Sequence, residues 1–142
     1  MKKEKEEILN EFVERFKHKF GKNLLSVVLF GSAATNISKK SDYDILAVVD
    51  NLSSDFRERD KLHIESAKEI KMPLDLILIT SEEFDNAVMN LSPLFLSISQ
   101  QKYRVLYGKD IIASGINKLK NFFVIKRISE LGWKVQEVEN VR

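Results

Sequence analysis

Two aspartates, Asp42 and Asp44, stand two positions apart at the start of an apolar run that is typical of a β-strand. Side chains at positions i and i+2 of a strand point to the same face, roughly 7 Å apart along the backbone. Two carboxylates on one face repel each other unless a cation lies between them. Mg²⁺ prefers hard oxygen ligands and is often held by one or two carboxylates together with substrate phosphates. Taken alone, however, such a pair is more typical of an ordinary loop before a strand.

A third carboxylate, Asp75, lies within the apolar run at 74–79, which predicts an interior β-strand. A bare carboxylate inside a sheet is costly, because buried charges are usually paired or bound to a metal. The alternative is an aspartate at a strand start that bonds to the backbone or to a nearby lysine. If the second and third strands are neighbours, Asp42, Asp44 and Asp75 can converge on one metal site.

Gly31 and Ser32 directly follow another apolar run, at 24–30. Glycine permits a close backbone approach, and a serine hydroxyl with nearby backbone N–H groups can donate to phosphate oxygens. By itself, a Gly-Ser pair indicates no more than a strand-ending turn. Together with the three aspartates, it places a phosphate contact and metal carboxylates at the same edge of one sheet. That combination suits phosphoryl or nucleotidyl transfer, in which catalysis is mainly positioning and charge stabilisation.

These residues need a sheet to position them, and the chain alternates helical and strand patterns as an α/β layer structure does. The patterns predict an α/β (α+β) fold with a small mixed sheet of about four strands flanked by helices. Strands are expected at 24–30, 43–49, 74–79 and 103–107. Helices are expected at 4–20, from Ser53 or Ser54 to about 70, at 81–90 after a capping box of Thr80 and Glu83, after Ser92-Pro93, and at 110–131.

The length of 142 residues fits a single domain, 1–142, with a core at about 22–108 and a C-terminal helical extension at about 110–142. Hydrophobic residues make up 44% of the chain and charged residues 31%, as expected of a soluble globular protein. The sequence contains no cysteine, which excludes disulfides and thiolate metal sites. No apolar run approaches the ~18 residues that span a bilayer, so we expect a cytoplasmic protein without membrane association.

The net charge of +2 hides an uneven distribution of charge along the chain. The stretch from Asp42 to Asp85 contains 12 acidic and 5 basic residues, and the stretch from Lys102 to Lys134 contains 8 basic and 2 acidic residues. An acidic stretch can hold metal, and a basic one can face phosphates or an acidic partner. The alternative interpretation is two ordinary solvated surfaces.

The segment 30–44 resembles the signature of the DNA polymerase beta-like nucleotidyltransferase superfamily, in which Gly-Ser is followed after nine residues by Asp-x-Asp. The small size of the chain is similar to that of the minimal nucleotidyltransferase (MNT) branch. The resemblance covers about residues 24–80 and extends loosely to Gly108. The sequence departs from the signature at Asn36, where many members carry glycine, and at 33–35, where many carry a basic residue.

The resemblance implies that Gly31 and Ser32 contact a nucleoside triphosphate, with ATP as the expected nucleotide. It implies that Asp42 and Asp44 bind Mg²⁺, with Mn²⁺ as an alternative. Asp75 would be the third carboxylate, which binds metal and helps to activate the acceptor hydroxyl. The implied reaction moves a nucleoside monophosphate, AMP from ATP, to that hydroxyl.

The same resemblance implies a partner, because MNT proteins often pair with a small helical protein of the HEPN type. In such pairs the helical protein can be an RNase toxin that is neutralised by the addition of AMP to a tyrosine. A small molecule with a hydroxyl is the alternative acceptor, and a non-catalytic antitoxin or scaffold is the alternative class. We do not expect an RNA-binding module built on 102–134, since no stacking platform is visible. The pair Phe122-Phe123 suits a core or an oligomer interface, which leaves a homodimer open.

Overall fold

The structure is a computed structural model of the chain, and it describes residues 2–35, 43–69, 73–121, 123–128 and 132–137. Its helices are α1 (Lys2–Phe20), α2 (Ser32–Thr35), α3 (Phe56–Glu69), α4 (Ser81–Met89), α5 (Pro93–Ser99) and α6 (Ile111–Lys120), with a 3₁₀ turn, η1, at Gly21–Asn23. Its strands are β1 (Leu24–Phe30), β2 (Tyr43–Val49), β3 (Leu74–Ile79), β4 (Arg104–Gly108), β5 (Phe123–Ile128) and β6 (Gly132–Glu137).

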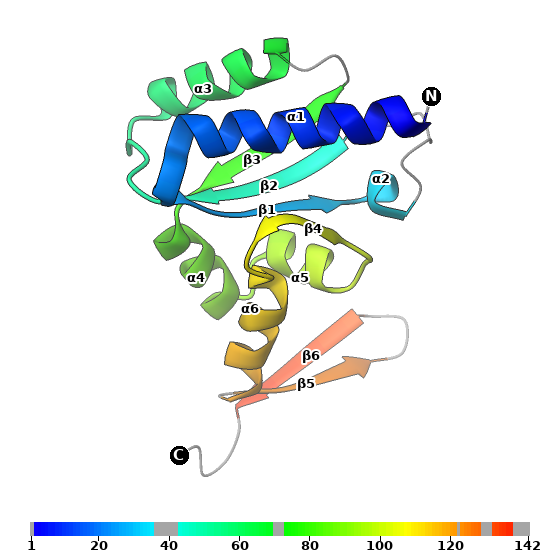
Figure 1. The fold of residues 1–142 in the computed structure, drawn as a ribbon. Helices are drawn as coiled ribbons and strands as arrows, with labels where there is room; N and C mark the ends of the chain where they lie inside the picture. Colours follow the sequence, from blue (N-terminus) through cyan, green and yellow to red (C-terminus); the bar gives the residue numbers. More distant parts are fainter. Residues whose placement is uncertain (1, 36–42, 70–72, 122, 129–131, 138–142) are drawn as a thin grey trace.

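A mixed four-stranded sheet forms the centre of the fold, with its strands in the order β3-β2-β1-β4 (Figure 1). β2 runs parallel to β3 and antiparallel to β1, and β1 runs antiparallel to β4. The connection between the parallel strands contains α3, because a parallel pair needs a crossover that returns the chain to the same end of the sheet. The predicted class, a small mixed sheet of about four strands flanked by helices, is therefore confirmed.

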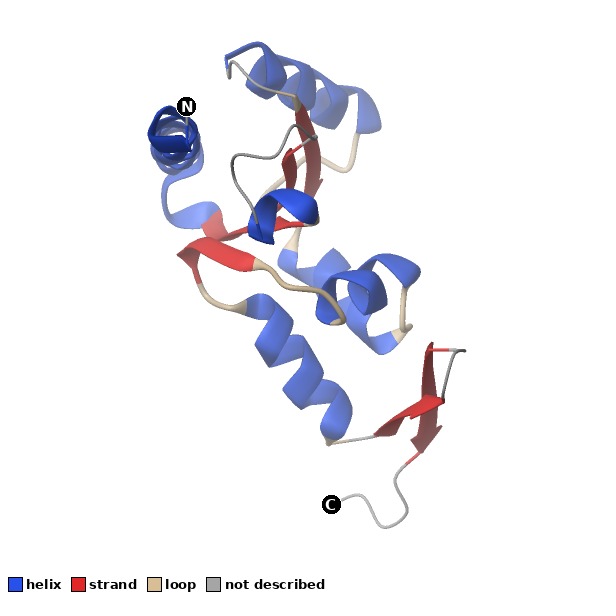
Figure 2. Cartoon of the chain, turned by 90° about the vertical axis from the view of Figure 1, so that its right-hand side faces the viewer, coloured by secondary structure: helices blue, strands red, loops and turns tan. Residues whose placement is uncertain are grey.

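Helices cover both faces of the sheet, with α1 and α3 on one side and α4, α5 and α6 on the other (Figures 1 and 2). Alternate residues of β2 enter the two cores: Tyr43, Ile45 and Ala47 pack on the α1 side, and Leu46 and Val48 pack on the opposite side. This double burial explains why β1 and β2 are near-continuous apolar runs. None of the described helices is long and apolar enough to cross a membrane.

Local capping residues set the starts of two helices below the sheet. The Thr80 hydroxyl accepts from the Glu83 N–H at 3.1 Å, and the Glu83 carboxylate accepts from the Thr80 N–H at 2.9 Å, so the predicted capping box opens α4. The Ser92 hydroxyl accepts from the Phe95 N–H at 3.2 Å, and Pro93 occupies the first turn of α5. The predicted starts of both helices are confirmed.

The C-terminal region differs from the predicted helix at 110–131. α6 ends at Lys120, Asn121 is its C-cap residue, and β5 and β6 then pair as an antiparallel hairpin. The successive aromatic and β-branched residues of β5 favour a strand over a helix. The helical part of the predicted extension is therefore limited to 111–120.

Strand β3 lies at an edge of the four-stranded sheet, so the prediction of an interior strand around Asp75 is wrong. Asp75 is exposed, while Leu76 is buried and the rest of the strand is half-buried. The apolar pattern of β3 comes from the helices that cover its two faces rather than from strands on both of its sides. The Asp75 carboxylate therefore avoids the desolvation that an interior position would impose.

Candidate active site

Three strand ends meet at one end of the sheet. β1 finishes at Phe30, and its antiparallel register pairs Phe30 with Asp44 near the start of β2. The parallel register of β2 and β3 pairs Asp44 with Asp75. Since neighbouring strands lie about 4.8 Å apart, the turn at Gly31 and the two aspartates lie side by side. We call this region, defined by Gly31, Asp44 and Asp75, the carboxylate end of the sheet.

Asp44 and Asp75 belong to the same face of the sheet, because residues in register on neighbouring strands share a face. It is the face that carries Leu46 and Ile77 and packs against α4, α5 and α6. Asp44 is half-buried and Asp75 is exposed. The two carboxylates thus continue an apolar stripe toward solvent, where they can hold a cation at a smaller desolvation penalty than in a core.

Tyr43 lies between the two predicted metal ligands Asp42 and Asp44 in sequence, but its side chain belongs to the opposite core, beside α1. Burial, with a smaller effect of the Glu6 carboxylate, raises the pKa of Tyr43. The phenol therefore stays neutral at neutral pH. Its role is to pack the start of β2 against α1 rather than to act on a substrate.

Gly31 places the backbone directly against the Asp44 carboxylate. The residue has a φ of 76°, and a Cβ added to it would lie 2.5 Å from Asp44 Oδ2. Its carbonyl accepts from the Ala34 N–H at 3.1 Å, which closes the turn into α2. Only glycine combines this backbone conformation with this approach, and the Asp44 carboxylate therefore lies in the space that a side chain at position 31 would need.

Gln101 completes the turn from another part of the chain, and sequence reasoning missed it. Its Oε1 accepts from the Gly31 N–H at 3.1 Å. Its Nε2 donates to the carbonyl oxygen and to the hydroxyl of Ser97, both at 3.0 Å. The contact joins residues 70 positions apart, and a single amide side chain in a loop gives no signal that could have identified it.

Asp42 lies outside the described residues, so the structure brings together two of the three predicted carboxylates, Asp44 and Asp75. Ser32 follows Gly31 as the first residue of α2 and is exposed. Among the described residues, no group of three or more His, Cys, Asp or Glu side chains could hold a metal. The described donors still fit Mg²⁺, because it takes hard oxygen ligands from one or two carboxylates and leaves other positions to phosphates and water.

A bidentate ion pair ties α1 to the sheet near this end. Arg104 pairs with Leu29 in the β1–β4 register, and its guanidinium donates to the two Glu6 carboxylate oxygens at 2.7 and 3.2 Å. Hydrogen bonding to Glu6 raises the pKa of Arg104. Arg104 is therefore engaged by Glu6, and its charge is partly neutralised there rather than directed at a bound anion.

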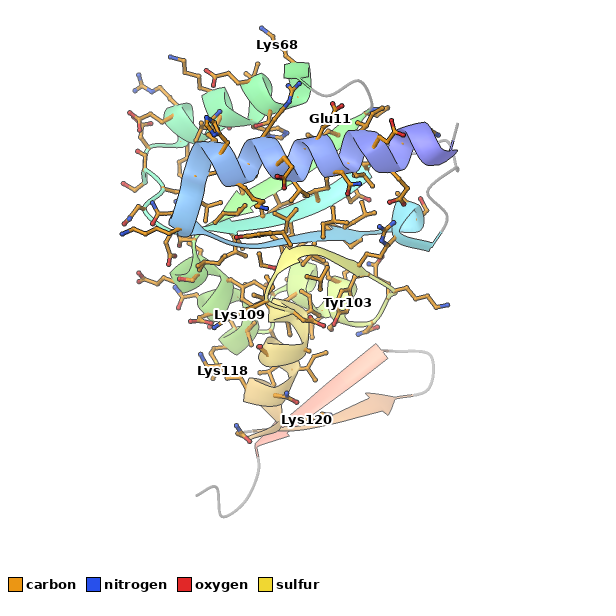
Figure 3. The ribbon with its side chains drawn as sticks, viewed as in Figure 1. Glu11, Lys68, Tyr103, Lys109, Lys118 and Lys120 are labelled. Atoms are coloured by element: carbon orange, nitrogen blue, oxygen red, sulfur yellow. The ribbon has the colours of Figure 1, made fainter. Side chains whose placement is uncertain are left out.

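A separate cavity of about 480 Å³ lies toward the other end of the sheet, and residues of α4 and α6 line much of it. Its lining is mainly apolar and includes Lys109 and Lys118, which are labelled in Figure 3. Lys118 Nζ lies 3.7 Å from Asp85 Oδ1, and among the described residues of this lining Asp85 is the only one with a carboxylate side chain. The described part of the lining therefore does not offer the paired carboxylates that the metal chemistry predicted above requires.

Comparisons with known proteins show the family to which the chain belongs. A family model described as "Nucleotidyltransferase domain" matches residues 9–107, a range that contains Gly31, Asp44, Asp75 and Gln101. A protein of Methanocaldococcus jannaschii named "Putative protein adenylyltransferase MJ1305" is 30% identical over 145 residues. The alignment covers 92% of this chain and 94% of that protein. The superfamily that the sequence signature resembles is thereby confirmed.

Solved structures share the fold. A chain of a toxin–antitoxin crystal structure with AMP-PNP aligns with 18% identity and a TM-score of 0.53, over 78% of this chain and 86% of that chain. A chain of the complex between a tri-AMPylated HEPN toxin of Shewanella oneidensis and an MNT antitoxin aligns with 17% identity and a TM-score of 0.53, over 84% and 87% of the two chains. These similarities agree with the mixed sheet and flanking helices described above.

Proposed function

The chain belongs to the nucleotidyltransferase domain family and is a nucleotidyltransferase, and from this premise we propose that it moves AMP from ATP to an acceptor hydroxyl in a Mg²⁺-dependent reaction. One observation carries the proposal: Gly31, Asp44 and Asp75 adjoin at one end of the sheet, and the missing side chain of Gly31 lets the Asp44 carboxylate lie directly against the turn. A glycine turn beside two carboxylates suits a triphosphate and its divalent cation.

We assign the nucleotide contacts to Gly31 and Ser32 and the metal ligands to Asp42, Asp44 and Asp75. A divalent cation, Mg²⁺ or Mn²⁺, would offset the negative charge of the triphosphate when bound there. The support from the described residues is the pairing of two hard oxygen donors in register on neighbouring strands. The half-buried position of Asp44 against the turn suits a ligand whose orientation is fixed before the nucleotide arrives.

The proposed transfer forms a bond between the acceptor oxygen and the α-phosphorus. It breaks the bond between the α-phosphorus and the oxygen that bridges to the β-phosphate, so pyrophosphate leaves with that oxygen. We assign the proton of the acceptor hydroxyl to the Asp75 carboxylate, because Asp75 is exposed and open to an incoming acceptor. Asp44, held against Gly31, orients the nucleotide side of the site.

For the acceptor we propose a tyrosine of a small helical HEPN-type partner. Two similar proteins support this choice. The relative from Methanocaldococcus jannaschii carries the name of a protein adenylyltransferase, and a structural neighbour belongs to a complex of a tri-AMPylated HEPN toxin with an MNT antitoxin. A protein acceptor agrees with both, whereas a small-molecule hydroxyl agrees with neither.

The test is a labelling assay with ATP that carries ³²P on the α-phosphate, the purified chain, Mg²⁺ and a helical HEPN-type protein that co-purifies with it. We expect label on a tyrosine of the partner, no label from γ-labelled ATP, and no label with the Asp44→Asn variant. Label that appears only in small molecules of a cell extract would show that the acceptor is a small-molecule hydroxyl rather than a protein tyrosine. A partner that is neutralised equally well by wild type and Asp44→Asn, without label, would make the chain a non-catalytic antitoxin.

A further inference from the structure

Gln101 is the residue beside the carboxylate end that the roles proposed so far do not use. It lies in the loop between α5 and β4, and its side-chain amide bridges Ser97 and Gly31. Only the NH₂ group of the amide can donate to the Ser97 carbonyl, and its Nε2 lies 3.0 Å from that oxygen. The contact with Ser97 therefore fixes the orientation of the amide, with Oε1 toward the Gly31 N–H at 3.1 Å.

The Gly31 N–H can bond to the Gln101 side chain because strand β1 ends one residue before it. β1 finishes at Phe30, and the β1–β2 register also stops there, so the N–H of Gly31 is not part of the ladder. Its acceptor is instead the neutral oxygen of an exposed glutamine. A phosphate oxygen is a stronger acceptor, because hydrogen bonds with one ionised partner are roughly twice as strong as neutral ones.

We propose that Gln101 sets the affinity of the site for the triphosphate, by covering the Gly31 N–H in the nucleotide-free protein and swinging away when a phosphate oxygen takes that N–H. This inference rests on the proposed function, because it assumes that the triphosphate contacts the Gly31 turn. When only the uncovered fraction of the protein binds, the apparent dissociation constant exceeds the intrinsic one by the inverse of that fraction. Gln101 thereby acts on nucleotide affinity without touching the reacting atoms.

The contact is built so that it can open. Gln101 and its partner Ser97 are both exposed, so neither is locked by core packing. The Gly31 N–H, once uncovered, can be satisfied by water or by an anion, which keeps the opening inexpensive. The alternative is that Gln101 holds the turn in its binding shape throughout. In that role, loss of the Gln101 side chain would weaken ATP binding instead of strengthening it.

The experiment is calorimetric titration of ATP in the presence of Mg²⁺ into wild type, Gln101→Ala and Gln101→Glu, after their thermal unfolding midpoints have been measured. We expect Gln101→Ala to bind ATP about two- to tenfold more tightly than wild type, which is the range that one neutral hydrogen bond contributes to an equilibrium. We expect Gln101→Glu to bind more weakly, because its carboxylate holds the N–H more strongly and repels the triphosphate. A structural role would move both variants in the same direction.

Gln100→Ala is the matched control, since Gln100 is the adjacent exposed glutamine and its side chain makes no hydrogen bond among the residues that the structure describes. We expect its affinity to equal that of wild type. If Gln101→Ala lowers the unfolding midpoint, Gln101→Asn is used in its place. Asparagine is one methylene shorter than glutamine, and we expect this variant also to bind ATP more tightly than wild type.

The outcomes separate the inference from the function on which it rests. ATP binding by wild type with equal or weaker binding by Gln101→Ala overturns the inference and leaves the proposed function intact. ATP binding by Gln101→Ala but not by wild type supports the inference in its strongest form. Absence of ATP binding by wild type and by Gln101→Ala, both folded, overturns the inference together with the proposed ATP site.

Discussion

Two strands of the sheet end with glycines of nearly the same backbone conformation, Gly31 after β1 with a φ of 76° and Gly108 in β4 with a φ of 77°. Their surroundings differ. A Cβ added to Gly31 would meet the Asp44 carboxylate, whereas a Cβ added to Gly108 would overlap the carbonyl oxygen of Leu25. The first neighbour is the end of a side chain, which can rotate, and the second is the main chain of strand β1, which is paired in the sheet.

Gly31 therefore allows close contact with a candidate site residue, whereas Gly108 allows close approach between two strands of the sheet. At the carboxylate end, the space beside Gly31 is bounded by a residue that the proposed chemistry uses. At the opposite end, the space beside Gly108 is bounded by backbone, and the Ser26 hydroxyl there donates to the Lys109 carbonyl at 2.7 Å. We therefore expect changes at the two ends to alter different properties of the protein, namely activity at one end and stability at the other.

The largest expected effect is that of Asp44→Asn on transfer. The change keeps the shape of the side chain and removes the charge that the proposed metal site needs. We expect the rate of transfer to fall by more than about 100-fold, since changes to residues that merely support metal ligands already cost 10- to 100-fold. Steady-state label transfer measures it, and the unfolding midpoint should stay within a few degrees of wild type. Transfer within about threefold of wild type would contradict the assignment of Asp44.

Gly108→Ala is expected to have the largest effect on stability. The new methyl group is strained by the positive φ and collides with a backbone oxygen that cannot move alone, so we expect a loss of about 2 to 4 kcal/mol in the free energy of unfolding. Urea denaturation measures this loss. Transfer per folded molecule should remain close to that of wild type. A large loss of specific activity with unchanged stability would break the contrast between the two ends.

Gly31→Ala should affect ATP binding more than stability, which is the reverse of Gly108→Ala. Because the Asp44 carboxylate can rotate away from the new methyl group, we expect a loss of only about 1 to 2 kcal/mol in stability, which is the strain of the left-handed conformation. The displaced carboxylate should weaken ATP binding in the presence of Mg²⁺ by about tenfold or more, because one lost charge-assisted contact has that size. Paired measurements of urea midpoint and ATP affinity check this. An ATP affinity equal to that of wild type would contradict the role assigned to Gly31.

The smallest effect concerns Glu83, at the opposite end from the site. Its hydrogen bond to Arg59, at 2.7 Å, holds the pKa of Glu83 below its usual range. A carboxylate with a lowered pKa stabilises the folded state above the unfolded pKa of about 4.3, and this contribution is lost as the pH falls through the folded pKa. Glu83→Gln keeps the capping geometry and removes the charge.

We therefore expect Glu83→Gln to be less stable than wild type by about 0.5 kcal/mol at pH 7, a small value because the Glu83 side chain is 44% exposed and its ion pair is screened. The difference should shrink toward zero below about pH 4. Urea denaturation of both proteins at pH 7 and pH 3.5 measures it, and transfer at pH 7 should be unchanged. A stability difference that is the same at both pH values would exclude the ion pair as its cause.

The bounds of β1, β2 and β3 could be predicted from the sequence because each is a short, mainly apolar run with turn residues on both sides. The same runs place Asp44 and Asp75 near the starts of their strands, and the two residues are neighbours because β2 and β3 are adjacent in the sheet. The edge position of β3 could not be read from its composition, since helices on both faces produce the same apolar pattern as flanking strands. Asp42 remains a prediction from the signature, because it lies outside the described residues.

Two other features depend on interactions that a local pattern does not encode. The predicted helix at 110–131 extended a helical period past Lys120 into residues whose β-branched and aromatic side chains favour a strand. The contact of Gln101 with Gly31 joins positions that come together only because β4 pairs with β1. Sequence reasoning therefore selected the candidate residues that carry their own chemical signal and did not select Gln101, whose position is defined by its neighbours.

The most direct test of the central claim is calorimetric titration of ATP into the wild-type chain and into Asp44→Asn, each with and without Mg²⁺. If the carboxylate end is the nucleotide site, the wild type binds ATP only when Mg²⁺ is present, and Asp44→Asn loses that Mg²⁺-dependent binding while it stays folded. If neither folded wild type nor folded Gln101→Ala binds any of ATP, CTP, GTP and UTP, or if Asp44→Asn binds ATP as tightly as wild type, the claim that Gly31, Asp44 and Asp75 form the nucleotide site is contradicted.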